Sequence, residues 1–173
     1  MPSKNLPKLQ PHGLRTLRAY QLAKKLGHLI RKVTGDFPKS EFRLIGQMRG
    51  AAVATFGNIA EGYGRSSPGD YVRFCDIARG SLAELGSYIE FCQEENMLNP
   101  DEAAPLFDLY NHTWNTLGAL IRSLNKKKQD GTWDRSYTLK EEAELYDIEE
   151  PSDHPTNPPP FHPADQLQDA VDE

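Results

Sequence analysis

The sequence predicts an all-α protein whose ordered part is an antiparallel up-and-down four-helix bundle. Apolar residues recur at alternating steps of three and four in four successive segments, which is the spacing of one helical face. Glycine, proline and capping residues separate these segments. With 173 residues, the chain has room for one domain and a tail. We expect a flexible arm over residues 1–13, the bundle over 14–126, and an acidic, proline-rich, largely disordered tail over 127–173.

The first helix is expected from about Leu14 to Thr34, where a turn sequence of glycine, aspartate and proline follows. Its apolar face holds Leu22, Leu26, Leu29, Ile30 and Val33. Its basic residues form two rows beside that face, one of Arg18, Lys25 and Lys32 and one of Lys24 and Arg31. Such rows are usually solvated surface. Here no acid interrupts them between Leu14 and Gly35, which favours binding of an anion.

The second helix is expected from about Lys39 to Glu61. The row of residues expected to face the core of the bundle, which we call the seam of the helix, is Ile45, Met48, Ala52, Thr55 and Ile59. A second stripe is uniformly small and consists of Gly46, Gly50, Ala54 and Gly57. Each glycine weakens a helix by about 1 kcal/mol relative to alanine, so the stripe predicts close approach by a neighbouring helix. Gly62 and Gly64 are expected to end the helix in a backbone conformation with positive φ.

The third and fourth helices each begin at a clear start signal. Ser67 is the expected cap of the third, which should run to about Asn96, and Asn99 is the expected cap of the fourth; a proline follows each cap. Pro105 is expected to kink or delay the first turn of the fourth helix. The third seam is Tyr71, Cys75, Ala78, Leu82, Leu85, Ile89 and Cys92, and the fourth is Leu106, Tyr110, Thr113, Leu117, Leu120 and Leu124.

A further apolar row on the fourth helix consists of Phe107, Trp114 and Ile121, seven residues apart. One seam suffices for a monomeric bundle. The extra row therefore suggests an oligomer face, with a wide intramolecular core as the alternative.

The two cysteines, Cys75 and Cys92, fall in one expected helix. At about 1.5 Å rise per residue they lie roughly 25 Å apart, too far for a disulfide. We interpret both as buried, reduced core residues rather than metal ligands or redox thiols. No apolar run approaches the roughly 18 residues that span a bilayer, and the N-terminus has no apolar signal region, so we expect a cytoplasmic protein.

Charge is divided unevenly along the chain, whose net charge is −5. Residues 1–60 hold 11 Lys and Arg against 2 acids, whereas residues 131–173 hold 12 acids against 2 bases. The basic front half predicts an anionic partner, and the acidic end could compete for the same surface.

The segment from Asn58 to Arg65 is the strongest candidate for a polar functional site. Asn58 and Glu61 are expected to bond the backbone of the turn that contains Gly62 and Gly64, with Glu61 also pairing Arg65 or Arg73; direct binding of a partner is the alternative. A lone carboxylate without a second acid, a histidine or a metal cluster does not divide proton transfer, so no catalytic residue is predicted. The five histidines show no ligand spacing, and we predict neither a metal nor a cofactor.

These residues together resemble the bacterial four-helix-bundle family of proteins encoded in intervening sequences of 23S rRNA genes. The resemblance covers roughly residues 17–125. It rests on Phe37-Pro38, Gln47-Met48-Arg49, Ala51-Ala52-Val53, Asn58-Ile59-Ala60-Glu61-Gly62, Gly64-Arg65, Tyr71, Phe74, Ala78, Gly80-Ser81 and Glu84-Leu85. Two positions depart from the family, which often has arginine where Gly50 stands and Ser-Ile-Pro where Ala54-Thr55-Phe56 stands.

The accessory variability determinant proteins of diversity-generating retroelements are similar in fold, and they are homopentamers that bind nucleic acid and a reverse transcriptase. The resemblance therefore implies a non-enzymatic homo-oligomer, with a pentamer favoured. It also implies an accessory protein that binds RNA or another nucleic acid, and a retroelement reverse transcriptase as a further partner. Basic residues of the first two helices and the following turn are the candidate contacts: Arg18, Lys24, Lys25, Arg31, Lys32, Arg43, Arg49 and Arg65. The tryptophans and most phenylalanines fall on apolar rows or in the tail, so we expect structured or non-specific nucleic acid rather than base readout. The alternative is a protein-interaction scaffold whose acidic tail recruits another protein, with no nucleic-acid role.

Overall fold

The computed structural model describes residues 12–132, and the regular structure in that range is entirely helical. Its elements are α1 (His12–Thr16), α2 (Arg18–Val33), the short 3-10 helix η1 (Lys39–Glu41), α3 (Phe42–Gly64), α4 (Pro68–Glu94) and α5 (Pro100–Gln129). The all-α class is therefore confirmed. The last helix continues to Gln129, past the expected border at residue 126. The predicted arm and tail fall largely on residues 1–11 and 133–173, which lie outside the described residues.

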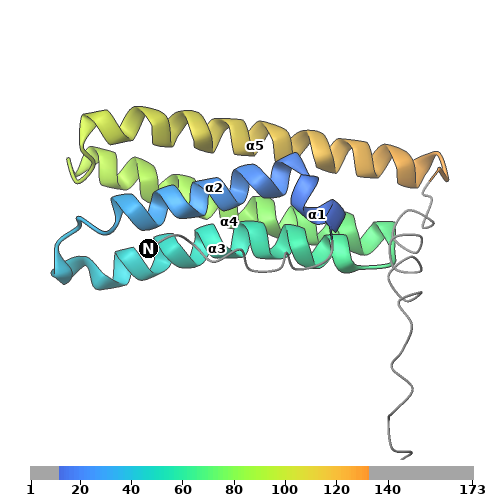
Figure 1. The fold of residues 1–173 in the computed structure, drawn as a ribbon, viewed down its shortest axis with the longest axis horizontal. Coiled ribbons are helices and arrows are strands. Elements are labelled where there is room, and N and C mark those ends of the chain that lie inside the picture. Colours follow the sequence, from blue (N-terminus) through green and yellow to red (C-terminus); the bar gives the residue numbers. More distant parts are fainter. Residues whose placement is uncertain (1–11, 133–173) are drawn as a thin grey trace, which may run out of the picture. The chain divides into compact units, whose positions relative to one another are not determined.

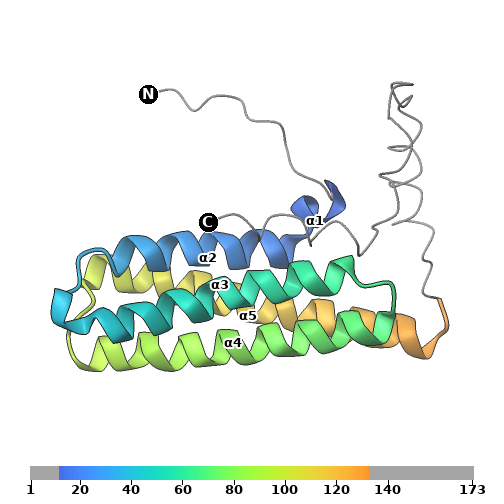
Figure 2. The same ribbon diagram turned by 90° about the horizontal axis from the view of Figure 1, so that it is seen from below.

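The four long helices, α2 to α5, lie side by side and alternate in direction (Figures 1 and 2). Short connections of residues 34–41, 65–67 and 95–99 join each helix to the next at alternating ends. α2 packs on α3, α3 on α4 and α4 on α5, and α2 also packs on α5. Each helix thus has two neighbours, and one apolar core lies between them.

The core is built from the predicted helical faces. All seven seam residues of α4 are buried, and so are most of those on α3 and α5. In α2 the buried face is shifted by part of a turn, because Leu22 and Leu29 are only half-buried and two alanines face the core. The buried residues of α2 are Ala19, Ala23, Leu26, Ile30 and Val33.

Two predicted helix starts are confirmed. The Ser67 hydroxyl accepts a hydrogen bond from the Asp70 backbone N–H at 3.4 Å, and the Asn99 side chain accepts one from the Asp101 N–H at 3.0 Å. Each cap is followed by a proline at the first helical position, where no N–H is needed. Pro105 lies inside α5 and does not delay its start.

The prediction of one continuous first helix is wrong, because the chain breaks at Leu17. Its backbone is extended (φ −66°, ψ 114°) and separates α1 from α2. The Gln21 side chain donates to the Arg15 carbonyl at 2.7 Å across the break. The break lets Leu14 become buried, with 7% of its surface exposed. Neither glycine nor proline stands at Leu17, so tertiary packing overrides a locally helical sequence.

The small stripe of α3 does not approach another helix of this chain, contrary to the prediction. A Cβ atom added at Gly46, Gly50 or Gly57 would meet nothing within 4 Å. The close approach lies at Gly62 instead. There an added Cβ would come within 2.8 Å of the Tyr71 ring and 2.9 Å of the Phe74 Cβ on α4.

The expected glycine stop of α3 is also wrong. Gly62 and Gly64 lie within the helix, and among the described residues only Asn96 and Gly131 have positive φ. The helix ends because Arg65 adopts an extended backbone (φ −79°, ψ 143°), which leads directly to the cap of α4.

The extra row of α5 divides between core and surface. Ile121 is 5% exposed and belongs to the core, and Phe107 packs against the core while half-buried. Trp114 keeps 38% of its surface exposed and stacks on Tyr110, with ring centroids 6.4 Å apart. The row therefore widens the intramolecular core and leaves only the tryptophan on the surface.

Candidate nucleic-acid interface

The basic residues of α2 separate into two rows because the helix buries its opposite face. Five of its residues are Lys or Arg and none is acidic. Arg18 and Lys32 lie on the side next to α5, where both have partners. Lys24 and Arg31 lie on the side next to α3, where they line a cleft. Lys25 lies between these two sides and lines a shallow hollow together with Lys24 and His28.

The row beside α5 is partly occupied by partners within the chain. Arg18 donates to His112 at 3.1 Å, and Lys32 pairs with Glu102 at 3.2 Å. The lysine side chain is largely exposed, so this ion pair contributes little to stability. It does reduce the positive charge that this side of α2 offers to a ligand.

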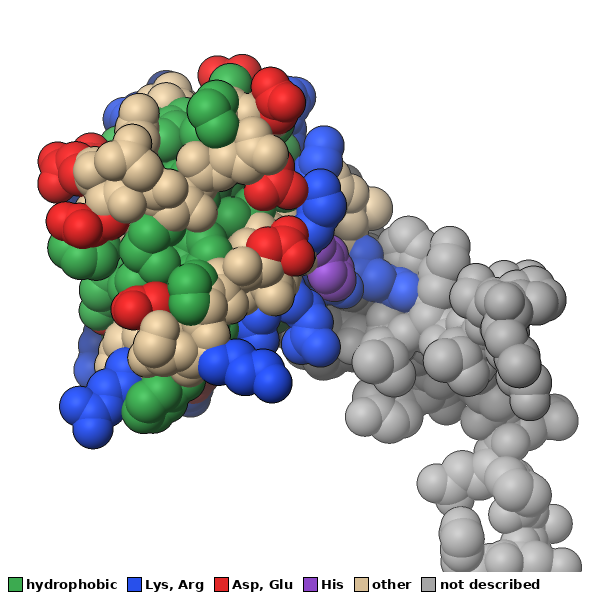
Figure 3. Space-filling model, turned by 90° about the vertical axis from the view of Figure 1, so that its left-hand side faces the viewer, with side chains coloured by type: hydrophobic (Ala, Val, Ile, Leu, Met, Phe, Trp, Pro, Cys, Tyr) green, Lys and Arg blue, Asp and Glu red, His purple; other side chains and the backbone are tan. Residues whose placement is uncertain are grey.

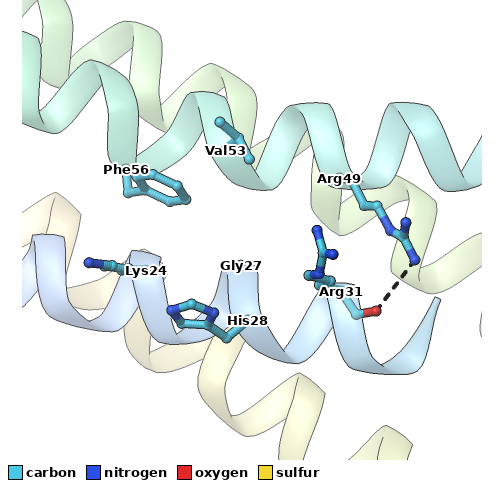
Figure 4. A pocket seen from close by; sticks show the side chains of 7 residues that line it. All are labelled: Lys24, Gly27, His28, Arg31, Arg49, Val53 and Phe56. Carbon is cyan, nitrogen blue, oxygen red and sulfur yellow. Dashed lines mark hydrogen bonds between the residues drawn. The ribbon is translucent and has the colours of Figure 1, made fainter. Parts of the chain in front are cut away.

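The other row lines a cleft of about 200 Å³ between α2 and α3, which we call the α2–α3 cleft. Figure 4 shows its side chains, which approach one another from the two antiparallel helices. The lining residues are Lys24, Gly27, His28 and Arg31 from α2, and Arg49, Val53 and Phe56 from α3.

Arg49 is held in place at one end of the α2–α3 cleft. Its Nε donates to the Thr34 hydroxyl at 2.8 Å, and its Nη2 donates to the Arg31 carbonyl oxygen at 3.4 Å. The Arg31 carbonyl belongs to the last turn of α2, where helix carbonyls carry partial negative charge, and Thr34 is the residue that caps the end of that helix. The guanidinium thus stabilises the end of α2 and offers a cation of fixed orientation to the cleft (Figure 4).

Phe56 bounds the other end of the cleft. Its ring packs edge to face on Tyr20, with centroids 6.3 Å apart and an interplanar angle of 85°. A Cβ added at Gly27 would meet the ring at 3.2 Å, so glycine lets the ring lie close to α2. The Lys24 ammonium lies 6.0 Å from the Tyr20 ring centroid, which keeps a cation beside this aromatic pair.

The charge around the α2–α3 cleft is uniformly positive, because no acidic residue is among its lining side chains. Within residues 12–132, no ion pair involves Lys24, Lys25, Arg31 or Arg49. At the end of the helices where residues 34–41 and 95–99 connect them, Lys and Arg gather on one side and Asp and Glu on another (Figure 3). Cations gathered in a groove reinforce one another's field and attract an anion.

Arg43 and Arg65 lie apart from this cleft, although the sequence grouped them with it. Arg43 stands in the first turn of α3 against the neighbouring Phe42 ring, at 5.7 Å from its centroid. Arg65 stands at the other end of α3, where it pairs with Glu61 and lies 4.9 Å from the Phe74 ring centroid. The eight candidate residues therefore do not form one surface.

The polar residues before the α3–α4 turn have structural partners. Glu61 pairs with Arg65, the first of the two predicted alternatives. The Asn58 amide donates to the Ala54 carbonyl at 2.8 Å inside α3, so it does not bond the turn as expected. Gly62 provides the room for α4 described above.

Sequence reasoning missed the apolar half of the cleft: Gly27, Val53 and Phe56, together with His28. In the sequence, Phe56 stands out only as part of a departure from the family pattern, whereas the structure places it half-buried at the edge of a basic groove. The pairing of these residues across the two helices could have been predicted from their distances to the connection between α2 and α3. Lys24 and Phe56, Gly27 and Val53, and Arg31 and Arg49 are each equidistant from residue 40, as partners across a helical hairpin should be.

Two further observations concern only the described part of the chain. No group of three or more His, Cys, Asp or Glu residues there is placed to hold a metal ion. None of the helices in residues 12–132 combines the length and the apolar character that a membrane span requires.

Comparison with known proteins gives one family. The sequence model of the 23S rRNA-intervening sequence proteins matches residues 15–119, which is more than half of the chain and includes every residue of the α2–α3 cleft. No curated protein matches the chain.

Proposed function

Since this chain belongs to the family of 23S rRNA-intervening sequence proteins, we propose that it is a non-enzymatic, oligomeric accessory protein that binds RNA. The observation that carries this proposal is the α2–α3 cleft. It gathers Lys24, Arg31 and Arg49 without an acidic neighbour, and one of these cations is fixed by hydrogen bonds. RNA is the anion we propose, because the family takes its name from intervening sequences of 23S rRNA.

The spacing of the cations suits a polyanion better than a single small anion. Lys24 and Arg31 are two helical turns apart, about 10 Å at 1.5 Å rise per residue. That distance corresponds to about three nucleotide steps of one strand at roughly 3.4 Å each. A row of such contacts binds phosphates with an affinity that depends strongly on salt and little on sequence.

The absence of catalysis is part of the proposal. Glu61, the acid that the sequence singled out, is engaged by Arg65 and is exposed. An acid–base mechanism needs two groups that exchange protons within hydrogen-bond reach of a substrate. The residues around the α2–α3 cleft offer a ligand positive charge and apolar contacts, rather than a pair of groups that exchange protons.

We further propose that an up-and-down four-helix bundle of this chain is the subunit of a homo-oligomer, with five copies favoured by the resemblance in fold to retroelement accessory proteins. Outside the α2–α3 cleft, three large apolar residues are exposed on α3 and α4: Phe42, Ile77 and Phe91. Phe42 lies one helical turn from Gly46, where an added Cβ would meet nothing within 4 Å, so a neighbouring helix could approach closely there. This surface replaces the Trp114 row as the proposed subunit contact, and a reverse transcriptase is the further partner that the same resemblance suggests.

The RNA proposal is tested by a charge-removing variant. Replacing Lys24, Lys25, Arg31 and Lys32 by glutamine should lower RNA affinity by about a hundred-fold or more at low salt. It should also reduce the slope of log affinity against log salt by about 3, since roughly 0.7 to 0.9 is lost per phosphate contact. The measurement is a fluorescence-anisotropy titration at several salt concentrations, with helicity and oligomer size checked in parallel.

A matched control removes the same charge from α4 and α5, outside the α2–α3 cleft. Arg73, Arg79, Arg122 and Lys126 are exposed on α4 and α5. Their replacement by glutamine should cost much less affinity than the change on α2. Equal losses of RNA affinity in the two variants would mean that only the net charge of the protein matters. If the α2 variant kept its affinity, the basic residues of α2 would be ordinary solvated side chains that do not bind RNA.

A further inference from the structure

We infer that the α2–α3 cleft accepts one unstacked base of a single-stranded RNA, while the flanking phosphates bind the cations at its rim. This inference rests on the proposed function, because it specifies which form of RNA the same site selects. It also reverses the expectation from sequence that this protein lacks an aromatic surface for bases.

The lining of the cleft is the first reason. A site for phosphates alone would need cations on an open surface, as on the outer side of α2. Here Lys24, Arg31 and Arg49 alternate with the apolar Val53 and Phe56. Apolar surface beside cations matches a ligand with a flat apolar part next to an anionic part, which is the chemistry of a nucleotide.

The size and shape of the cleft are the second reason. Its volume of about 200 Å³ is below the roughly 300 Å³ at which pockets for drug-sized ligands begin, so it suits a group of about one ring system. In a duplex the bases are stacked inside and cannot enter a cleft between two helices, whereas unpaired bases can. The cleft therefore favours a single strand over a duplex.

The third reason is that the cleft is organised before any ligand arrives. Arg49 is fixed by the Thr34 hydroxyl and by the Arg31 carbonyl, and the second of these bonds is drawn in Figure 4. Phe56 packs edge to face on Tyr20. Groups that are already ordered lose less entropy on binding. His28 stands exposed on the α2 side of the cleft, and its ring nitrogens can donate to or accept from the polar edge of a base.

An acidic peptide is the competing ligand, because glutamate side chains would satisfy the same cations. It would leave Val53 and Phe56 without a partner of matching chemistry, which is why we favour the nucleotide. The experiment below therefore includes polyglutamate as a separate probe.

The test compares two RNAs of equal strand length, about twelve nucleotides, one an unstructured oligouridine strand and the other a blunt duplex. In the full chain, Phe56→Leu should lower affinity for the single strand about ten-fold and change affinity for the duplex less than about two-fold, since stacking is worth roughly 1–3 kcal/mol per base. Phe107→Leu is the matched control. It alters another half-buried phenylalanine, on α5 and outside the cleft, and should leave both affinities unchanged.

A second measurement does not depend on how well the variant folds. An oligouridine strand carrying 4-thiouridine is cross-linked by ultraviolet light to the unaltered protein, and the attached peptides are identified by mass spectrometry. Cross-links to the peptides that contain His28 or Phe56 support the inference. Cross-links confined to other helices overturn it.

The remaining outcomes separate this inference from the proposed function. If Phe56→Leu affects neither RNA while the glutamine variant of α2 loses both, the basic face binds RNA but the cleft holds no base. If polyglutamate binding shows the same dependence on Phe56, the cleft is a peptide site and the inference is wrong. If the unaltered chain binds no RNA at all, the proposed function itself fails.

Discussion

Cys75 and Cys92 show how the core constrains single residues. Both are free, fully buried thiols in the seam of α4, as the sequence predicted. Burial raises the pKa of Cys75 to about 12, with the nearby Asp76 charge adding to the shift, and raises the pKa of Cys92 to about 11, with Glu41 contributing. The Cys92 thiol also lies 3.7 Å from the Met48 sulfur, so it packs as an apolar side chain. The thiols are therefore packing groups with little thiolate at neutral pH.

These raised pKa values predict a loss of stability at alkaline pH. A thiol with an ordinary pKa of 9.0 in the unfolded chain releases its proton before the folded thiol does. Folding stability from this source is therefore complete below about pH 9 and is lost as pH rises towards the folded pKa. Each thiol should lower the free energy of unfolding by up to about 1.4 kcal/mol per pH unit in that window. Urea unfolding at about pH 8, 9 and 10 measures the slope.

Cys75→Ala isolates the contribution of the Cys75 thiol. The variant should be less stable at neutral pH, because it loses buried volume, but its stability should fall less steeply above about pH 9. An unchanged slope would show that the thiol does not contribute to alkaline unfolding.

At the scale of the helices, the α3–α4 contact depends on Gly62. Alanine there should destabilise the protein by about 1–3 kcal/mol, because the overlap with Tyr71 and Phe74 outweighs the better helix propensity. Gly80 is the matched position, exposed inside α4 with nothing within 4 Å of an added Cβ. Gly80→Ala should stabilise the protein by up to about 1 kcal/mol. Urea unfolding midpoints compare the two, and effects of the same sign would contradict the assigned contact.

Helix positions were predictable because seam and cap signals are local. The spacing from Tyr71 to Cys92 and the caps Ser67 and Asn99 depend on residues a few positions apart, so they could be recognised without a structure. The break at Leu17 could not, since neither glycine nor proline marks it and the burial of Leu14 is visible only in the folded chain. The glycines show the same limit. Composition marks them as unusual, but only the packing distinguishes the crowded Gly62 from its open neighbours on α3.

The basic residues of the candidate site could be predicted from the sequence, but its apolar residues could not. Positive charge can be counted along one helix, so Lys24 and Arg31 were found. The sequence also places these two in a row of their own, but the helix that each row faces becomes known only when α3 and α5 are packed on α2. The role of Phe56 depends on pairing α3 back onto α2, which requires the register of the hairpin. From sequence alone, an aromatic residue on a helix is therefore interpreted as a core residue. Its exposure at a groove becomes visible only when the neighbouring helix is in position.

At the scale of the whole molecule, the proposed subunit contact lies on α3 and α4. Ile77 and Phe91 expose 42% and 47% of their surface, so aspartate at both positions should not disturb the core. The double variant Ile77→Asp, Phe91→Asp should convert a homo-oligomer into monomers, since it places charge in an apolar contact. Sedimentation velocity measures the size. Asn115→Asp with Ala119→Asp adds the same charge to exposed positions of α5 and should leave the oligomer intact. A monomeric unaltered chain, or an oligomer that survives the first change, would contradict the proposed contact.

The distribution of charge over the whole chain predicts how the acidic end acts on RNA binding. Residues 131–173 hold 12 acids and 2 bases, so a chain that ends at residue 130 carries a net charge of +5 instead of −5. An attached polyanion repels RNA and competes for the same cations at a high local concentration. Removing it should strengthen RNA binding about ten-fold or more at low salt, and much less near 0.15 M salt, where charges are screened beyond about 8 Å. Anisotropy titrations of both chains at the two salt concentrations measure the effect.

A full-length variant in which those 12 acids become asparagine or glutamine separates charge from bulk. It should bind RNA as tightly as the shortened chain, because the repulsion is electrostatic. If only shortening strengthens binding, the end of the chain obstructs the basic face by its volume. If neither change alters an affinity that the unaltered chain clearly shows, the acidic end does not act on the α2–α3 cleft. If none of the three chains binds RNA, the acidic end is better explained as the recruiting segment of a protein-interaction scaffold.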